Sequence, residues 1–176
     1  MSSHNSSNGA LETGPVFSSG LVAVLAGSAR ILLASHSTDG AQAAEKAAME
    51  LCVDRPKSSI HHVIVVPKAL WHGMTGDDWL NNGSTRNTFC RYVESTLQKE
   101  IDEQLSILKT KIDTLAIQYS YEVIVGEPEE SLIAEINTNK YDVVVMGSPR
   151  PKGKSGLRSR MRPDQLVKSI NTPLLI

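Results

Sequence analysis

The stretch that decides the predicted fold class is Tyr121–Ser148, which reads YEVIVGEPEESLIAEINTNKYDVVVMGS. Its two apolar runs, Val123–Val125 and Asp142–Met146, end at Gly126 and Gly147, and between them apolar residues recur at helical spacing. Runs that are apolar without alternation are typical of parallel strands covered by helices on both faces. The stretch therefore predicts a strand, a helix and a second strand joined by a right-handed crossover. A ligand site is expected where the carboxyl ends of such strands meet, at Gly126 and Gly147.

The rest of the chain extends this unit in both directions. The same reasoning predicts further strands at 30–35, 59–66 and 172–176, and helices at 41–52, 88–118 and 164–170. The long helix over 88–118 should bury an apolar side and leave its charged side in water. Residues 68–86 are predicted to form a long irregular connection, in which Trp71 and Trp79 either hold the connection against the body or line a partner surface.

Composition predicts one domain, at 29–176, after a flexible leader at 1–28 that is rich in Ser, Asn and Gly. The formal net charge of -1 gives the whole chain no attraction to nucleic acid or membranes. No apolar run is long enough to span a membrane, and the leader lacks the basic start of a signal peptide. Cys52 and Cys90 match no metal spacing and favour a reducing compartment. We therefore expect a cytoplasmic protein without membrane contact.

Four segments in order carry a resemblance to a known family: RILLASHSTDGAQAAEKA, VIVGEPEESLIAEI, YDVVVMGS and LVKSINTPLLI. They resemble the universal stress protein (UspA-like) family over a core from about Arg30 to Ile176. The resemblance implies an α/β fold of the adenine-nucleotide α-hydrolase-like type. Its doubly wound five-stranded parallel sheet has the order 3-2-1-4-5, with helices on both faces. The resemblance also implies a homodimer through the C-terminal strand, and the apolar edge at 172–176 independently favours such a partner.

In the family, members that bind ATP share an Asp at the end of the first strand, a Gly-x-Pro motif and a glycine-containing phosphate loop. In this sequence the Gly-x-Pro motif is intact from Gly126 to Pro128, and Gly147 matches the first glycine of the loop. His36 stands at the Asp position. Because Gly147 would let backbone approach a ligand, we expect Gly147→Val to damage a ligand site more than the fold.

Three further departures lie in the loop. Arg150 stands at the second glycine position, and Arg160 and Met161 stand at the final Gly and Ser/Thr positions. The resemblance therefore implies a degenerate ATP-binding loop with no cofactor expected, unless the loop is rebuilt around Gly153 and Gly156 to hold ATP or another adenine nucleotide. The ligand-binding candidates are His36, Gly126, Pro128, Gly147, Ser148, Arg150, Gly153, Ser155 and Gly156.

Catalytic and metal motifs are absent from the sequence. It has no nucleophile-elbow signature, no Gly-x-Gly-x-x-Gly and no Cys/His cluster. His61 and His62 are adjacent in a predicted strand, so their side chains point to opposite faces and cannot share one metal ion. No catalytic residue is therefore predicted.

Six basic residues in the segment 150–162 supply the remaining functional signal, because guanidinium and ammonium groups can hold a phosphate. The leading hypothesis is a non-enzymatic regulatory or stress-response protein of the universal stress type that binds ATP weakly and takes a small anion or nucleotide. One alternative is a binder of nucleic acid or another polyanion through 150–162. A further alternative is an ATP-binding stress protein with a rearranged phosphate loop, and an enzyme such as a weak ATPase is a last alternative, for which the sequence offers no obvious general base.

Overall fold

A computed structural model describes residues 27–35, 39–53, 55–67, 83–115, 117–148 and 161–176. The predicted leader lies almost entirely outside these residues, as do Trp71 and Trp79. The elements follow one another as β1 (Arg30–Ala34), α2 (Asp39–Cys52), β2 (Ser59–Pro67), α4 (Gly83–Asp113), β3 (Gln118–Gly126), α5 (Pro128–Thr138), β4 (Val143–Met146), α6 (Pro163–Ser169) and β5 (Leu174–Leu175).

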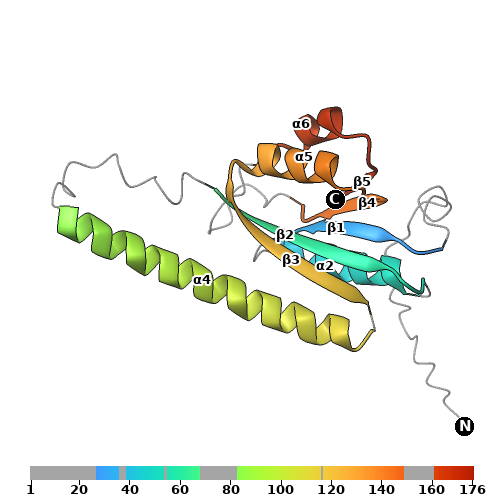
Figure 1. Cartoon of the computed structure of the whole chain (residues 1–176), viewed down its shortest axis with the longest axis horizontal. Helices are drawn as coiled ribbons and strands as arrows, with labels where there is room; N and C mark the ends of the chain where they lie inside the picture. The colour runs from blue at the N-terminus through green and yellow to red at the C-terminus, as the bar shows by residue number, and fades with distance from the viewer. Residues whose placement is uncertain (1–26, 36–38, 54, 68–82, 116, 149–160) are drawn as a thin grey trace, which may run out of the picture.

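The five strands form one parallel sheet in the order β3-β2-β1-β4-β5, which confirms the predicted topology (Figure 1). β1 pairs with β2 from Arg30 opposite Ser59, and with β4 from Ile31 opposite Val143. The strand order reverses between β1 and β4. Ligands of open α/β sheets bind at such a point, outside the carboxyl ends of the strands.

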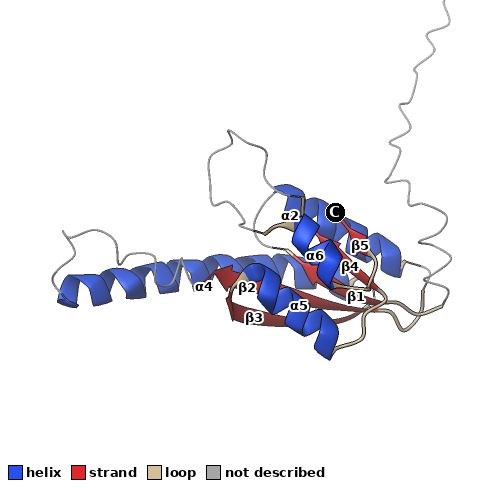
Figure 2. Ribbon diagram, turned by 90° about the horizontal axis from the view of Figure 1, so that it is seen from above, coloured by secondary structure: helices blue, strands red, loops and turns tan. Residues whose placement is uncertain are grey.

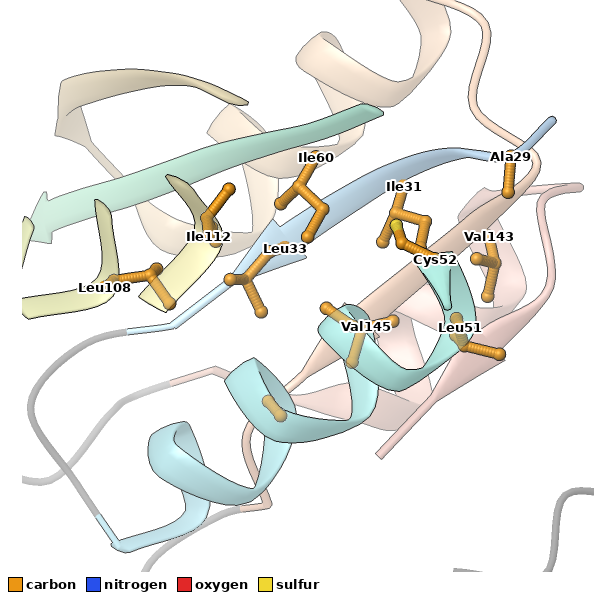
Figure 3. Close-up of a cluster of buried hydrophobic side chains, with 12 residues drawn as sticks. Ala29, Ile31, Leu33, Leu51, Cys52, Ile60, Leu108, Ile112, Val143 and Val145 are labelled. Carbon is orange, nitrogen blue, oxygen red and sulfur yellow. The ribbon is translucent and has the colours of Figure 1, made fainter. Parts of the chain in front are cut away.

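Helices cover both faces of the centre of the sheet, as predicted. Successive side chains of β1 point to opposite faces, so Ile31 and Leu33 pack toward α2 and α4, while Leu32 and Ala34 pack toward α5 and α6. Figure 2 shows the sheet from above. Figure 3 shows the first of these clusters, in which strand residues meet Leu51 and Cys52 of α2 and Leu108 and Ile112 of α4. Each fully buried Leu or Ile contributes about 1.5–3 kcal/mol.

The predicted boundaries of the long helix were wrong at both ends. α4 begins at Gly83, five residues early, and ends at Asp113, so Gln118 belongs to β3 instead. Leu115, predicted for the apolar side of the helix, is 44% exposed. The segment 118–126 pairs with β2 over nine residues, and this pairing overrides the helical spacing that continues through the sequence.

The prediction that helices cover the run Val123–Val125 on both faces was also wrong, because only Ile124 packs against a helix-covered cluster. β3 is an edge strand, and Tyr121, Val123 and Val125 are 56%, 38% and 46% exposed. α4 packs beside β2 instead, through Ile101, Leu105, Leu108 and Ile112, and Figure 1 shows its N-terminal half extending past the sheet. The solvated charged side predicted for this helix is confirmed, for example, by the exposed pair Lys99 and Glu103.

Candidate functional site

The candidate site lies at the carboxyl edge between β1 and β4, where α2 begins. A Cβ atom placed on Gly147 would lie 2.9 Å from the amide nitrogen of Ala41, and one placed on Gly40 would lie 2.6 Å from the carbonyl oxygen of Ser148. The amide of Gly147 donates to the carbonyl oxygen of Ala34 at 3.4 Å. The chain leaving β4 is thus packed directly on the first turn of α2, and both glycines are needed for this contact.

This contact changes the role assigned to Gly147. The sequence predicted a glycine kept for ligand approach, so that Gly147→Val would harm a site more than the fold. The atoms that a side chain would strike belong to the backbone of Gly40 and Ala41, which cannot move without displacing α2. This clash argues against that prediction, because Gly147 is needed to seat the helix. Ser148, the next candidate, is exposed at the same edge.

The Gly-x-Pro motif forms the start of α5. Gly126 ends β3 and is buried, and a Cβ atom there would strike the hydroxyl of Ser131. Pro128 is the first residue of α5, where its missing N–H breaks no helical hydrogen bond. Gly126 is three strands away from Gly147, which alone separates them by at least roughly 14 Å at the spacing of strands in a sheet. The two predicted glycines therefore share an edge of the sheet without forming one pocket wall.

An ion pair that sequence reasoning missed joins the start of α5 to the chain entering α6. Glu129 Oε1 accepts hydrogen bonds from the backbone N–H of Arg162 at 2.6 Å and from its Nε–H at 3.1 Å. A carboxylate in the first turn is also stabilised by the helix dipole. Glu129 therefore partly neutralises both this helix end and the last basic residue of the segment 150–162, which makes the N-terminus of α5 a poor place for a second anion.

A chain of polar side chains lies buried beneath the edge, and sequence reasoning missed it as well. Ser35 Oγ lies 2.9 Å from His62 Nε2 and 3.4 Å from Glu45 Oε1, and His62 Nδ1 lies 2.9 Å from the hydroxyl of Tyr119. Ser35, Glu45 and His62 are buried, and Tyr119 is half-buried. We call these four residues the buried polar chain. Because Ser35 directly follows β1 and the other members come from α2, β2 and β3, no local sequence pattern predicts it.

Burial dominates the electrostatics of this chain. It lowers the pKa of His62 to about 4, so the imidazole is neutral near pH 7. It also raises the pKa of Glu45, an effect that the positive charge of Lys111 and the hydrogen bond from Ser35 partly oppose. The pKa of the Tyr119 phenol is raised, chiefly by burial. The buried polar chain therefore carries at most one negative charge near neutral pH, on Glu45.

His61 occupies the opposite face of the sheet, as predicted. Its Nδ1 lies 2.8 Å from Ser120 Oγ and its Nε2 lies 3.6 Å from Glu135 Oε1, while its ring stacks on Tyr141. Within the described residues, no group of three or more His, Cys, Asp or Glu side chains could hold a metal ion. Cys52 is free and buried, and burial raises the pKa of its thiol to about 11, which makes it a poor nucleophile.

The remaining candidates, His36, Arg150, Gly153, Ser155 and Gly156, lie outside the described residues. The degenerate phosphate loop therefore stays a prediction. Among the helices that the structure describes, none combines the length and the apolar character needed to cross a membrane.

Comparison with known proteins identifies the fold. No family model matches the chain, and no curated protein matches its sequence. Solved structures do match. A universal stress protein UspA from Lactobacillus plantarum has a TM-score of 0.60 at 15% identity, covering 85% of this chain and 97% of that chain. One from Burkholderia pseudomallei has a TM-score of 0.56 at 17% identity, covering 84% and 93%.

A third match is a universal stress protein in complex with cAMP, with a TM-score of 0.53 at 13% identity, covering 86% of this chain and 97% of that chain. The class of protein that these comparisons define is a doubly wound α/β protein with a switch point between its first and fourth strands. The chain has the UspA-like fold, as the sequence predicted.

Proposed function

We propose that the protein is a non-enzymatic regulatory protein of the universal stress type, which binds a phosphate-bearing small molecule at the edge between β1 and β4. The observation that carries this proposal is the position of α2. This 14-residue helix begins at the switch point and is seated on Gly147 and Ser148. The positive end of a helix dipole and its first N–H groups favour phosphate at such a place, an attraction that the negative charge of Asp39, the first residue of α2, reduces. A protein of the same fold in complex with cAMP supports the ligand class.

ATP is expected to bind weakly. His36 replaces the aspartate that ATP-binding members of the family carry, and Arg150, Arg160 and Met161 replace three positions of their phosphate loop. Each missing contact should cost about 1 kcal/mol, so together they should weaken binding by roughly two orders of magnitude or more. The arginines offset this loss only in part, because screened side-chain contacts to phosphate in water contribute little.

The buried polar chain supports a non-enzymatic role. Ser35 and His62 are the described pair most like a nucleophile and its base, with 2.9 Å between Oγ and Nε2. Their exposed fractions are 7% and 1%, so the hydroxyl is not accessible to a substrate in this structure. We therefore assign this pair to the interior of the protein and not to catalysis.

Calorimetry with ATP plus magnesium, cAMP and inorganic phosphate tests the proposal. We expect a Kd for ATP weaker than about 100 μM. Ser148→Asp should abolish binding of whichever anion binds, because it places a negative charge at the edge. Ser106→Asp, the same change on the exposed surface of α4, should leave that binding intact. A Kd for ATP in the low micromolar range would instead support the rearranged phosphate loop.

Polyanion binding through 150–162 is the second candidate. Arg162, the one basic residue of that segment that the structure describes, already pairs with Glu129, which reduces the charge available to a polyanion. Fluorescence anisotropy with a DNA duplex separates the two hypotheses. Binding that is strong at low salt and collapses at moderate salt through counterion release would favour the polyanion.

The proposal includes a cytoplasmic location and a homodimer joined through β5. β5 pairs with β4 along one side, and in the described part of the chain its other side meets no strand. Ile176 at its end and Val167 on α6 are 51% and 55% exposed. A second copy of the chain would cover this apolar edge.

A further inference from the structure

We propose that the buried polar chain is a proton-operated relay, in which uptake of one proton by Glu45 reverses the direction of all three hydrogen bonds and changes the tautomer of His62. The geometry points to this because the four groups form an unbroken line with an ionisable carboxylate at one end. The line runs from Tyr119 through His62 and Ser35 to Glu45. No described residue of the proposed ligand site takes part in it, so the inference does not rest on the proposed function.

One direction is fixed while Glu45 is ionised. A carboxylate can only accept, so the Ser35 hydroxyl donates to Glu45 Oε1 over 3.4 Å. Ser35 Oγ must then accept from His62 Nε2–H at 2.9 Å, and the carbonyl oxygen of Ser35, 3.4 Å from the same nitrogen, favours a proton there. His62 Nδ1 is left without a proton and accepts from the hydroxyl of Tyr119 at 2.9 Å. The neutral imidazole is therefore the Nε2–H tautomer.

A proton added to Glu45 makes the opposite direction available. The carboxylic acid donates to Ser35 Oγ, the Ser35 hydroxyl turns and donates to His62 Nε2, and His62 Nδ1–H donates to the oxygen of Tyr119. The Tyr119 hydroxyl hydrogen then turns outward, which the half-buried position of that residue allows. Before the change three hydrogens lie on the line, on Tyr119, His62 and Ser35. Afterward four are present, and the extra one is the proton taken up.

The surroundings favour Glu45 over His62 as the place where the proton rests. From α4 the positive charge of Lys111 opposes a proton on Glu45, but less strongly than burial favours one. From β2 the ring of His61, on the far side of the strand, disfavours a charged imidazole at His62. From β3, Tyr121 stacks on Tyr119 with ring centroids 6.4 Å apart. Burial disfavours a charged imidazole at His62 and a charged carboxylate at Glu45, so a proton on Glu45 leaves every member of the chain neutral.

The reversal has a path to the carboxyl edge of the sheet. Ser35 directly follows β1, and Glu45 lies two turns into α2, the helix whose first residues pack on Gly147 and Ser148. The two ends of the Ser35–Glu45 hydrogen bond therefore belong to the two elements that meet at the switch point. When that bond changes direction, the amide environments of Gly40 and Gly147 should change with it.

Nuclear magnetic resonance of ¹⁵N-labelled protein tests the relay. In a titration from alkaline to acid pH, the expected result is that His62 passes from predominantly Nε2–H to predominantly Nδ1–H as Glu45 takes up its proton, without becoming doubly protonated. The midpoint should equal that of the Glu45 carboxyl carbon in the same samples and that of the amides of Gly40 and Gly147.

Glu45→Gln removes the titrating group while keeping its size, and it should hold His62 in one tautomer across the whole range. If this variant does not fold, the comparison of the His62 and Glu45 midpoints in the unchanged protein still tests the proposal. The proposal is overturned if Glu45 titrates while His62 keeps Nε2–H, if neither group changes over the range, or if His62 gains a second proton where Glu45 was expected to gain one.

Discussion

His62 shows how burial decides what a histidine does. In the sequence it is one of two adjacent histidines in a strand, and nothing there separates the pair beyond the alternation of faces. In the structure His62 is 1% exposed and fully hydrogen-bonded, while His61 faces charged and aromatic side chains on the other side of the sheet. A neutral, partnered imidazole in a core stabilises the fold only while it stays neutral.

The stability of the protein should therefore fall in acid, in part through His62. Its pKa is lowered to about 4 in the folded state from 6.5, so between these values the unfolded chain binds more protons. The stabilisation is present above pH 6.5 and is lost as the pH falls toward 4, by on the order of 3 kcal/mol. The loss is measured by urea unfolding, which gives the free energy of unfolding of the protein and of the His62→Gln variant at each pH.

The gap in unfolding free energy between the two proteins should shrink over the same range. Because Glu45 is linked to His62 through Ser35 and its raised pKa makes acid favourable to the fold, the same comparison is repeated in a Glu45→Gln background, which removes that opposing titration. A gap that stays constant with pH would contradict the assignment of the effect to His62.

A substitution at Gly147 tests whether α2 packs on the backbone of that residue. Gly147→Ala should destabilise the fold by about 1–3 kcal/mol, because the new Cβ strikes the backbone at the start of α2. Ser148→Ala, one residue further on and exposed, should change stability by less than about 0.5 kcal/mol. Thermal unfolding of the two variants provides the measurement. Equal stabilities would show that α2 is not seated on Gly147.

Among the elements, the central strands were the most predictable and the edge was the least. β1 and β4 are continuous apolar runs because helices cover them on both faces, and each was placed to within a residue. Helical spacing continues past the end of α4, and only pairing with β2 shows that 118–126 is a strand. The wrong helix end and the wrong cover for β3 thus share one cause, which is that partners far along the chain decide them.

The packing of α4 can be tested along its C-terminal half. Leu108 is 2% exposed in the core, whereas its neighbour Ile107 is 59% exposed. Leu108→Ala should cost about 2–5 kcal/mol, and Ile107→Ala should cost less than about 0.5 kcal/mol. Chemical unfolding of both variants compares the same truncation to alanine at a buried and at an exposed position of one helix turn. Similar costs for the two substitutions would mean that α4 is rotated from the position described here.

For the molecule as a whole, the sequence predicted the edge of the sheet at which the candidate residues lie, but not which of them come together there. Gly147 and Ser148 do lie at the predicted edge, where they meet α2, but Gly126 and Pro128 start a helix three strands away. The buried polar chain joins residues 10, 27 and 57 positions apart. Such distances carry no periodic signal, so contacts of this kind become visible only when the sheet order is known.

The assembly proposed above predicts a homodimer at micromolar concentration by light scattering. Ile176→Asp should give a monomer, because it places a charge on the apolar end of β5. Val125→Asp adds the same charge at the opposite edge of the sheet, where the exposed fraction is 46%, and should leave the dimer intact. A dimer disrupted by Val125→Asp alone would place the interface on β3.

The two histidines on opposite faces of β2 also allow the opening of the sheet to be measured within a single protein. An acylating reagent that attacks neutral imidazoles can reach His61, whose side chain is 23% exposed, but it reaches His62 only when the sheet opens. The ratio of the two labelling rates, read by mass spectrometry from a single peptide, therefore reports how often the centre of the sheet separates. Since both imidazoles sit on one short peptide, errors in reagent concentration and in digestion affect them alike and drop out of the ratio.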